Sequence, residues 1–412
     1  ALEQHESHWK GLIGIIYADN AATTRMHAAA VSAMLSCMEG AWGNPSSMHT
    51  AGQTAAEALR SARERIATCI GAQPKEIFFT SGGSEADNQA ILSAARLGAQ
   101  HGKTHIISTA FEHHAVLHTL EKLRYNGFEI ELLPVGSLGT VTARQVADAI
   151  RDDTALVSVM YANNEIGSIL PIREIGAVCQ EREVMFHTDA VQAAGHLPID
   201  VQTQGIDMLS LSAHKFHGPK GIGALYARQG ITLTNLIDGG AQERGKRAGT
   251  ENVPAIAGMA AALEEACAHM AESTAKVASL RDRLIEGLSK IPHATFNGDP
   301  VNRLPGNVSF SFEGIEGESL LLLLDDKGIC TSTGSACSSS SLEPSHVLLA
   351  IGQPPELAHG VLRVSLSVDN TVAEVDAILM AVREAVSFLR TNPLPLRKAA
   401  MEKFIPQTPN ST

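Results

Sequence analysis

Residues 80–85 read Thr-Ser-Gly-Gly-Ser-Glu and stand between an apolar run, Ile77–Thr80, and an amphipathic segment, Glu85–Leu97. This order predicts a strand, a glycine-rich turn and a helix. Glycines let backbone N–H groups approach a ligand, and a helix N-terminus carries a partial positive charge, so the turn suits a phosphate group. A tight turn capped by Ser84 explains the same residues. Because Gly-x-Gly-x-x-Gly is missing, a single phosphate is favoured over a dinucleotide.

The alternation of strand and helix continues beyond this turn. Further apolar runs of strand length are His105–Thr109, Ala155–Tyr161, Val184–His187, Met208–Ser212 and Gly223–Tyr226. The amphipathic stretches between them are His114–Tyr125, Ala143–Arg151 and Ile172–Glu181. This pattern predicts an α/β fold with a mostly parallel sheet covered by helices, and the nearly continuous apolar runs indicate strands buried on both faces.

A different pattern begins near Pro254. One or two long helices are expected over residues 255–290, then short strands at Val308–Phe312 and Arg363–Ser367 and a helix at Val372–Leu389, which suits a smaller α+β domain. We therefore expect a large domain of residues 24–265 and a small domain of residues 1–23 and 266–391. Residues 392–412 carry four prolines and no apolar period, which predicts a mobile C-terminal tail.

Composition limits the classes of function. The 412 residues carry a formal net charge of −12 and no basic run, which argues against direct nucleic-acid binding and against a polybasic membrane patch. The first ten residues lack the apolar core of a signal peptide, and the longest apolar run is too short to span a bilayer. Six cysteines with no Cys-x-x-Cys pair argue against a disulfide scaffold and a cysteine-based metal site. We expect a cytoplasmic protein with free thiols.

An acidic residue ends one of the predicted strands. His187-Thr-Asp-Ala-Val-Gln192 places Asp189 after an apolar run. A carboxylate there is costly to bury unless it pairs with a cation or a ring N–H. An aspartate that caps the next helix is the ordinary structural alternative.

A lysine ends another predicted strand. Lys215 follows Ser212 and His214 and precedes a glycine-rich turn. A desolvated lysine near other cationic groups has a lowered pKa and can form a Schiff base. A surface lysine on a loop is the alternative, which describes Lys220 better than Lys215.

Five polar clusters follow the ends of predicted strands. Three are those at residues 80–85, 187–192 and 212–215, and the other two are Glu112-His113-His114 and Asn163-Asn164-Glu165. In open α/β sheets the ligand crevice lies along this edge. A phosphate cradle, a buried acid, a Schiff-base lysine and a histidine able to stack on a ring together indicate pyridoxal 5'-phosphate.

A stretch of small residues lies late in the chain. Thr333-Gly-Ser-Ala-Cys-Ser-Ser-Ser-Ser341 predicts a flexible loop on which Cys337 is exposed, and such a thiol is reactive if its pKa is lowered. A linker with an incidental thiol is the alternative. Cys330 has an apolar context and fits a buried, inert thiol better.

These motifs and several others together span about residues 15–390. The further stretches are Tyr17-Ala-Asp-Asn-Ala-Ala-Thr-Thr, Gly43-Asn-Pro-Ser-Ser-Met-His, Gln242-Glu-Arg-Gly-Lys-Arg-Ala-Gly-Thr-Glu-Asn and Leu342-Glu-Pro-Ser-His-Val. The set resembles the NifS/IscS-type cysteine desulfurases, class V aminotransferases of the fold-type I pyridoxal-phosphate enzymes, and looks closer to NifS. The resemblance implies a seven-stranded, mostly parallel sheet in the large domain, and a catalytic cysteine loop at about residues 328–342 in the small one.

The resemblance also implies the catalytic residues. Lys215 would hold the cofactor covalently and later move protons at the substrate. His113, selected over His114 by the family pattern, would stack on the ring and act as an acid or base. The Cys337 thiolate would attack the sulfur of L-cysteine, which leaves a persulfide on Cys337 and L-alanine as the product.

Binding residues are implied in the same way. Asp189 would pair with the ring nitrogen, and Arg363 would bind the substrate carboxylate through its bidentate fork. The other implied cofactor residues are Gln192, Asn164, Gly83, Ser84, Ser212, His214 and Thr250, and Asn164 and Asn44 are further implied substrate residues. Thr250 would come from the neighbouring subunit of a homodimer.

The resemblance implies sulfur delivery to an acceptor protein, either an iron–sulfur scaffold or a sulfur carrier. Three alternatives stay open: a selenocysteine lyase, another pyridoxal-phosphate lyase or transaminase, and a catalytically silent scaffold. Cys337 argues against the second, since those reactions need no thiol nucleophile. Intact Lys215, Asp189 and Cys337 argue against the third.

Overall fold

The computed structural model describes residues 14–334 and 344–392. Cys337, residues 1–13 of the predicted small domain and nearly all of the predicted C-terminal tail lie outside the described residues. No helix in the described ranges is long and apolar enough to cross a membrane.

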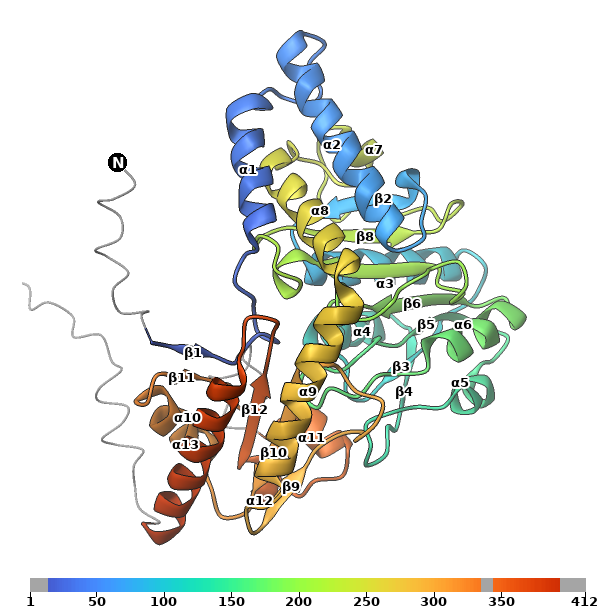
Figure 1. Ribbon diagram of the computed structural model, residues 1–412. Helices are drawn as coiled ribbons and strands as arrows, with labels where there is room; N and C mark the ends of the chain where they lie inside the picture. The colour runs from blue at the N-terminus through green and yellow to red at the C-terminus, as the bar shows by residue number, and fades with distance from the viewer. Residues whose placement is uncertain (1–13, 335–343, 393–412) are drawn as a thin grey trace, which may run out of the picture.

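A seven-stranded sheet forms the centre of the structure (Figure 1). Its spatial order is β2-β8-β7-β6-β5-β3-β4, and β8 runs antiparallel to both of its neighbours while the other pairs are parallel. The strands are β2 (Ile77–Thr80), β3 (His105–Thr109), β4 (Glu129–Leu133), β5 (Thr154–Ser158), β6 (Met185–Asp189), β7 (Met208–Ser212) and β8 (Gly223–Ala227). The predicted α/β fold with a mostly parallel sheet is therefore confirmed.

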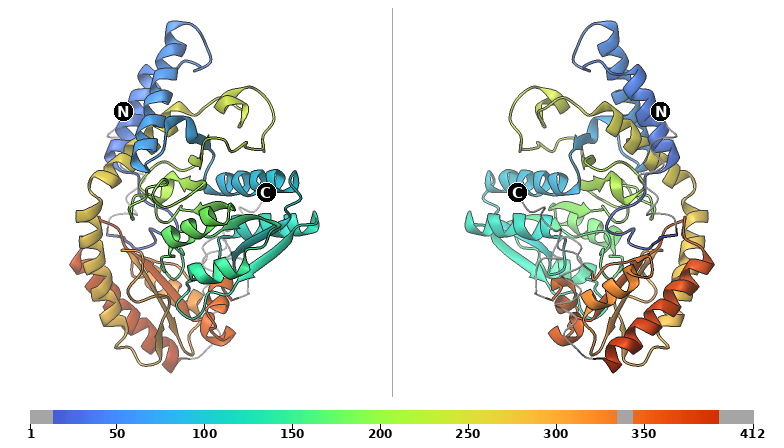
Figure 2. Two further views of the ribbon diagram at one scale, coloured as in Figure 1. Left: turned by 90° about the vertical axis from the view of Figure 1, so that its right-hand side faces the viewer. Right: turned by 90° about the vertical axis from the view of Figure 1, so that its left-hand side faces the viewer.

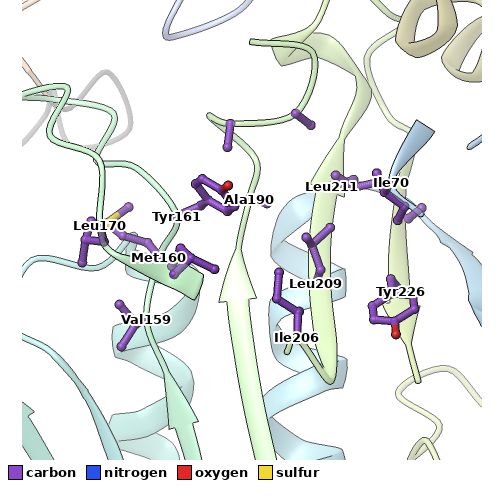
Figure 3. Packing of buried hydrophobic residues seen from close by; sticks show 14 of the residues in the cluster. Ile70, Val159, Met160, Tyr161, Leu170, Ala190, Ile206, Leu209, Leu211 and Tyr226 are labelled. Atoms are coloured by element: carbon purple, nitrogen blue, oxygen red, sulfur yellow. The ribbon is translucent and has the colours of Figure 1, made fainter. Parts of the chain in front are cut away.

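Helices cover both faces of this sheet, because successive side chains of a buried strand point to opposite sides. In β7, Met208 packs with helices α3 (Gly83–Ala99) and α4 (His114–Tyr125), whereas Leu209 and Leu211 pack on the other face. Helices α2 (Thr50–Cys69), α6 (Ile172–Glu181) and α8 (Val253–Ala268) cover that second face. Figure 3 shows the side chains of Leu209 and Leu211 among the apolar residues of this core.

A second hydrophobic cluster lies lower in the view of Figure 1. There α9 (Met270–Leu288), α10 (Gly317–Asp325) and α13 (Val372–Thr391) pack against strands β10 and β12. The remaining elements of this part are β1 (Ile16–Tyr17), β9 (Ala294–Phe296), β10 (Asn307–Phe312), β11 (Ile329–Cys330), α11 (His346–Ala350), α12 (Pro355–Ala358) and β12 (Val361–Ser365). The predicted long helical stretch is two helices, α8 and α9, that meet at His269.

Several elements of the structure were absent from the predicted pattern. Strand β4 has alternating polar residues and lies at the sheet edge, where charges block further strand pairing. Helices α1 (Ala28–Gly40) and α2 form a pair that projects at the top of Figure 2. Short α7 (Gln242–Gly245) and α5 (Ala143–Ala149) complete the helices of residues 24–265.

Candidate active site

The carboxyl ends of four strands bring the predicted site residues to one edge of the sheet. Gly83 follows β2, His113 follows β3, Asp189 ends β6, and Lys215 closes a single helical turn after β7. Strand β2 shares the direction of β6 and β7, because it pairs antiparallel with β8, as β7 does. Parallel strands place their carboxyl ends at one edge, so residues more than a hundred positions apart meet there.

A cavity of about 410 Å³ lies at the start of α3 and suits an anion. It is lined by Thr23, Ser81, Gly82, Gly83, Ser84, Glu85, Ser212, His214, Lys220 and Gly221. The N-cap residue Gly82 offers no capping side chain, so a ligand can meet the N–H groups of the first helical turn. A Cβ atom on Gly83 would stand 2.6 Å from Val191 Cγ2, so only glycine fits at this approach.

Lys215 is held by the backbone of the segment that follows β1. Its Nζ donates hydrogen bonds to Ala21 O at 2.6 Å and Ala22 O at 2.8 Å. Gln192 Nε2 donates to the same Ala21 oxygen at 3.0 Å. Burial lowers the pKa of His214 to about 4, and the positive charges of Lys215 and Lys220 add to this effect.

Asp189 belongs to a buried cluster of acids and imidazoles. Polar atoms of Asp87, His113 and Asp189 all lie within 4.8 Å of one another. Burial raises the pKa of Asp189 to about 6, opposed by the Val191 N–H and by the charge of Lys215. Burial and the neighbouring Asp189 raise the pKa of Asp87, so Asp87 keeps its proton more readily than an exposed aspartate does. The cluster therefore presents Asp189 as the acid more easily ionised.

His187 supports this cluster from β6. It is fully buried between Ser158 Oγ at 2.9 Å and Ser210 Oγ at 3.0 Å, and its Nε2 lies 3.6 Å from Asp87 Oδ1. Burial lowers the pKa of His187 to about 3, so the ring stays neutral. Neither His187 nor Asp87 was assigned a role from the sequence. An aspartate among the buried alanines of α3 is a signal that could have identified Asp87.

His113 is the N-cap of α4, and its Nδ1 accepts the Ala115 N–H at 3.1 Å. This bond leaves the proton of the neutral ring on Nε2. Burial first, then the charge of Lys215, lowers the pKa of His113 to about 4. The ring is therefore neutral at pH 7, able to stack on a planar ligand and to donate from Nε2.

Glu112 is buried directly before His113. Its Oε1 accepts from Thr109 Oγ1 at 2.6 Å and from Met160 N at 2.9 Å, while its Oε2 has no partner among the described residues. Burial raises the pKa of Glu112 to about 8. The carboxyl group therefore keeps its proton in the folded protein at neutral pH.

Glu112→Gln is expected to remove a pH dependence of stability. The folded protein holds the Glu112 proton up to about pH 8, whereas the unfolded chain releases it near the ordinary pKa of about 4.3. The wild-type free energy of unfolding should thus fall relative to Glu112→Gln between pH 5 and pH 9, by a few kcal/mol. Urea unfolding at both pH values measures the difference. Exposed Glu174→Gln is the matched control, and equal pH profiles for wild type and Glu112→Gln would contradict the assignment.

Arg363 lies on β12 and is 1 % exposed. Its Nη2 donates to Asp19 Oδ1 at 2.9 Å, and its Nη1 donates to Gly334 O and, at 3.3 Å, to Asn164 O. Its Nε has no partner among the described residues. A buried donor without a partner is costly, so this nitrogen favours an incoming acceptor such as a carboxylate.

Two predicted residues do not join this group within one chain. Asn44 lies exposed in the turn between α1 and α2, where its Oδ1 accepts from Ser46 N. Thr250 is exposed after the loop in which Arg247 pairs with Glu85, and neither residue lines the cavity at α3. Cys337 lies outside the described residues, between Gly334 and Ser345, which bond to Arg363 and Glu165 respectively.

Comparisons with known proteins relate this chain to one family. The family model for class-V aminotransferases matches residues 16–378. The cysteine desulfurase IscS of Methanosarcina thermophila is 55% identical over 375 residues, which cover 91% of this chain and 93% of that protein. A solved NifS-like protein has a TM-score of 0.85 and 38% identity, covering 91% of this chain and 100% of the other. A structure of SspA in complex with cysteine has a TM-score of 0.76 and 37% identity, covering 86% of this chain and 100% of the other.

The chain belongs to the class-V aminotransferase family. Within it, the chain is of the NifS/IscS type, the cysteine desulfurases. Proteins of this family use pyridoxal 5'-phosphate, and the donor set at the sheet edge fits that group: an anion cradle, a lysine amine, an acid and a neutral ring.

Proposed function

We propose that the protein is a pyridoxal-phosphate-dependent cysteine desulfurase. It converts L-cysteine to L-alanine and transfers the sulfur to Cys337 as a persulfide, for iron–sulfur cluster assembly or other sulfur delivery. The observation that carries the proposal is the segment Asp19–Ala22. Asp19 binds the guanidinium of Arg363, and the carbonyls of Ala21 and Ala22 bind Lys215 Nζ. One short segment thus holds both the arginine proposed to bind the substrate carboxylate and the lysine proposed as the nucleophile.

The geometry of the sheet edge supports the proposed cofactor residues. Gly83, Ser84, Ser212 and His214 would hold the phosphate, and Lys215 would attach the ring covalently. Asp189 would pair with the ring nitrogen, His113 would stack on its face, and Gln192 and Asn164 would bond to its oxygen side. When bound, pyridoxal 5'-phosphate supplies an electron sink for bonds at the substrate Cα.

Each remaining step belongs to a side chain of this protein. Arg363 and Asn164 would orient the substrate by its carboxylate. Lys215 Nζ would take the proton from Cα once it is displaced, and neutral His113 would pass protons at the same face. The Cys337 thiolate would form the new S–S bond as the substrate Cβ–S bond breaks, and Cβ gains a proton to give alanine.

A homodimer would complete this site. Helix α1 and the turn after it expose an apolar stripe at helical spacing: Val31, Leu35, Met38 and Trp42, of which Trp42 is 72% exposed. Such a face is typical of an interface. Asn44 lies between α1 and α2, the helices that project at the top of Figure 2. A second copy docked there would bring Asn44 and Thr250 near the neighbouring site. The division into a large domain of residues 24–265 and a small domain belongs to the same proposal. A cytoplasmic, reducing setting is also part of it, because a persulfide is lost under oxidation.

Leu35→Asp is expected to dissociate the dimer, because a charge in an apolar interface leaves a desolvated group without a partner. Light scattering after size-exclusion chromatography should show the monomer mass at micromolar concentrations, and L-cysteine turnover should fall at least about tenfold as Asn44 and Thr250 are lost. Met380→Asp, at an exposed apolar position of α13, should leave the dimer intact. A Leu35→Asp protein that remains dimeric would contradict the interface.

Product analysis tests the function itself. With L-cysteine and a thiol reductant, the wild-type protein should release alanine and sulfide in equal amounts. Formation of pyruvate and ammonia, or of a keto acid from added amino donors, would show a different lyase or a transaminase. A faster reaction with L-selenocysteine that has no Cys337 dependence would show a selenocysteine lyase.

A further inference from the structure

A layer of polar side chains crosses the buried face of the sheet that α3 covers, next to the proposed cofactor site. It consists of Ser158 of β5, His187 of β6, Ser210 of β7 and Asp87 of α3, each no more than 1 % exposed. In the strand register Ser158 lies beside His187, and Ser210 lies beside Asp189. Because Asp189 follows His187 by two residues, both side chains point to the same face. The layer therefore ends at Asp189.

The hydrogen bonds of this layer run in one direction. The Ser210 hydroxyl donates to the carboxyl group of Asp87, so its oxygen accepts the N–H of His187 Nε2, which is 3.0 Å away. The other ring nitrogen, Nδ1, then accepts from Ser158 Oγ at 2.9 Å. His187 Nε2 also lies 3.6 Å from Asp87 Oδ1. One tautomer of the neutral ring thus satisfies both serines and holds Asp87 through Ser210.

The surroundings of Asp87 and Asp189 favour a charge on only one of them. Polar atoms of the two lie within 4.8 Å in a buried site, where two negative charges repel strongly. Asp189 Oδ1 accepts the Val191 N–H at 2.9 Å, and the positive charge of Lys215 acts on Asp189. Asp87 Oδ1 has no hydrogen-bond partner among the described residues, and an ionised oxygen without a donor is costly to bury. The proton therefore belongs to Asp87 and the charge to Asp189.

The other titratable groups around Asp87 do not favour a charge on it. These groups are Asp189, His113, His187 and Glu112. Burial keeps both histidines neutral at pH 7, because it lowers the pKa of His113 to about 4 and that of His187 to about 3. Burial also keeps Glu112 protonated, because it raises the pKa of that carboxyl group to about 8. None of these four groups is therefore a cation that would hold Asp87 in its ionised form.

We propose that Asp87 is a positioning residue for the cofactor, which Ser158, His187 and Ser210 hold as a neutral acid against Asp189. The two acids then carry one negative charge between them, placed on Asp189, which would pair with the ring nitrogen. This single charge favours the protonated ring nitrogen, the form that acts as an electron sink. Apolar side chains of similar volume often serve a core equally well, so a buried polar layer at this place indicates a function. The inference rests on the proposed cofactor site and adds residues beneath it.

The test measures binding and absorbance of pyridoxal 5'-phosphate added back to the full-length apoprotein, without substrate. Asp87→Asn keeps a neutral group of the same shape. Cofactor affinity and the pH midpoint at which the visible absorbance of the attached form changes should therefore stay within about threefold and about 0.3 units of the wild type.

Asp87→Leu makes the surroundings of Asp189 apolar, which favours the protonated form of that acid and weakens its pairing with the ring nitrogen. Cofactor affinity should fall at least about tenfold, and the absorbance midpoint should rise by about half a unit or more. The midpoint rises because an unprotonated ring nitrogen withdraws less electron density from the lysine linkage. His187→Phe, which removes the N–H that orients Ser210, should move both quantities in the same direction.

Ser93→Ala is the matched control, because Ser93 is a buried hydroxyl of α3 outside the layer, bonded to Gln89 O and Thr234 N. It should match the wild type in both quantities. Circular dichroism verifies folding, and His187→Phe replaces Asp87→Leu if that variant does not fold.

Two results would overturn the proposal. A midpoint shifted as far in Asp87→Asn as in Asp87→Leu would show that Asp87 is ionised in the wild type. Wild-type affinity and midpoint in the folded Asp87→Leu or His187→Phe protein would show that the layer only supports the fold. Cofactor loading and alanine formation by the wild type are measured on the same preparation, so either result leaves the desulfurase proposal standing.

Discussion

Lys215→Ala is expected to abolish L-cysteine turnover, by roughly 10⁴-fold or more, because one side chain both attaches the cofactor and moves the proton at Cα. The structure holds Lys215 Nζ against the carbonyls of Ala21 and Ala22, and alanine has no amine to place there. Borohydride reduction followed by peptide mass spectrometry should find cofactor fixed to the Lys215 peptide of the wild type. The variant should show none, together with loss of the visible absorbance of the attached form.

Lys220→Ala is the matched control, because Lys220 lines the same cavity at the start of α3. Its loss removes one positive charge beside the proposed phosphate site, so cofactor affinity should fall while covalent attachment at Lys215 persists. Turnover at saturating cofactor should stay within about tenfold of the wild type. Cofactor fixed in Lys215→Ala protein, or turnover retained there, would contradict the assignment of Lys215.

Cys337→Ser is expected to lower sulfide release from L-cysteine by roughly 10³-fold or more, while cofactor attachment and absorbance stay as in the wild type. A hydroxyl remains protonated at neutral pH and is a far weaker nucleophile toward sulfur than a thiolate. Gly334 and Ser345, on either side of the segment, bond to Arg363 and Glu165. The chain therefore contacts the arginine proposed to bind the substrate carboxylate three residues before Cys337.

Cys330→Ser is the control for this substitution, seven residues earlier on β11. Burial raises the pKa of the Cys330 thiol, so it contributes little thiolate, and its variant should retain most of the activity. Equal losses in both variants would show a general effect on this part of the fold. Wild-type sulfide release by Cys337→Ser would contradict a persulfide on that residue.

The sequence predicted the sheet edge well, because its signals are local. Gly83, His113, Asp189 and Lys215 each follow a short apolar run, and parallel strands bring such positions together without any knowledge of loop paths. The edge of the sheet at which we expect the ligand follows from the same rule. The motif order then identified the family, which the comparisons confirm.

Other features depend on distant contacts and left no local pattern. The bond of Asp19 to Arg363 joins residues 344 positions apart, and it fixes the arginine that the sequence could name only through a resemblance. Strand β4 alternates like a surface segment because it is an edge strand. Asn44 and Thr250 have no partner at this site among the described residues, and we propose that a second subunit brings them to it.

The central claim is sulfur transfer from L-cysteine to Cys337, and mass spectrometry of that residue tests it most directly. Holoenzyme is mixed with one equivalent of L-cysteine without reductant, alkylated after a single turnover and digested. The account predicts one extra sulfur atom on the Cys337 peptide and on no other cysteine peptide, with one alanine formed per chain. Alanine formed without sulfur on Cys337, or extra sulfur on another cysteine alone, would contradict it.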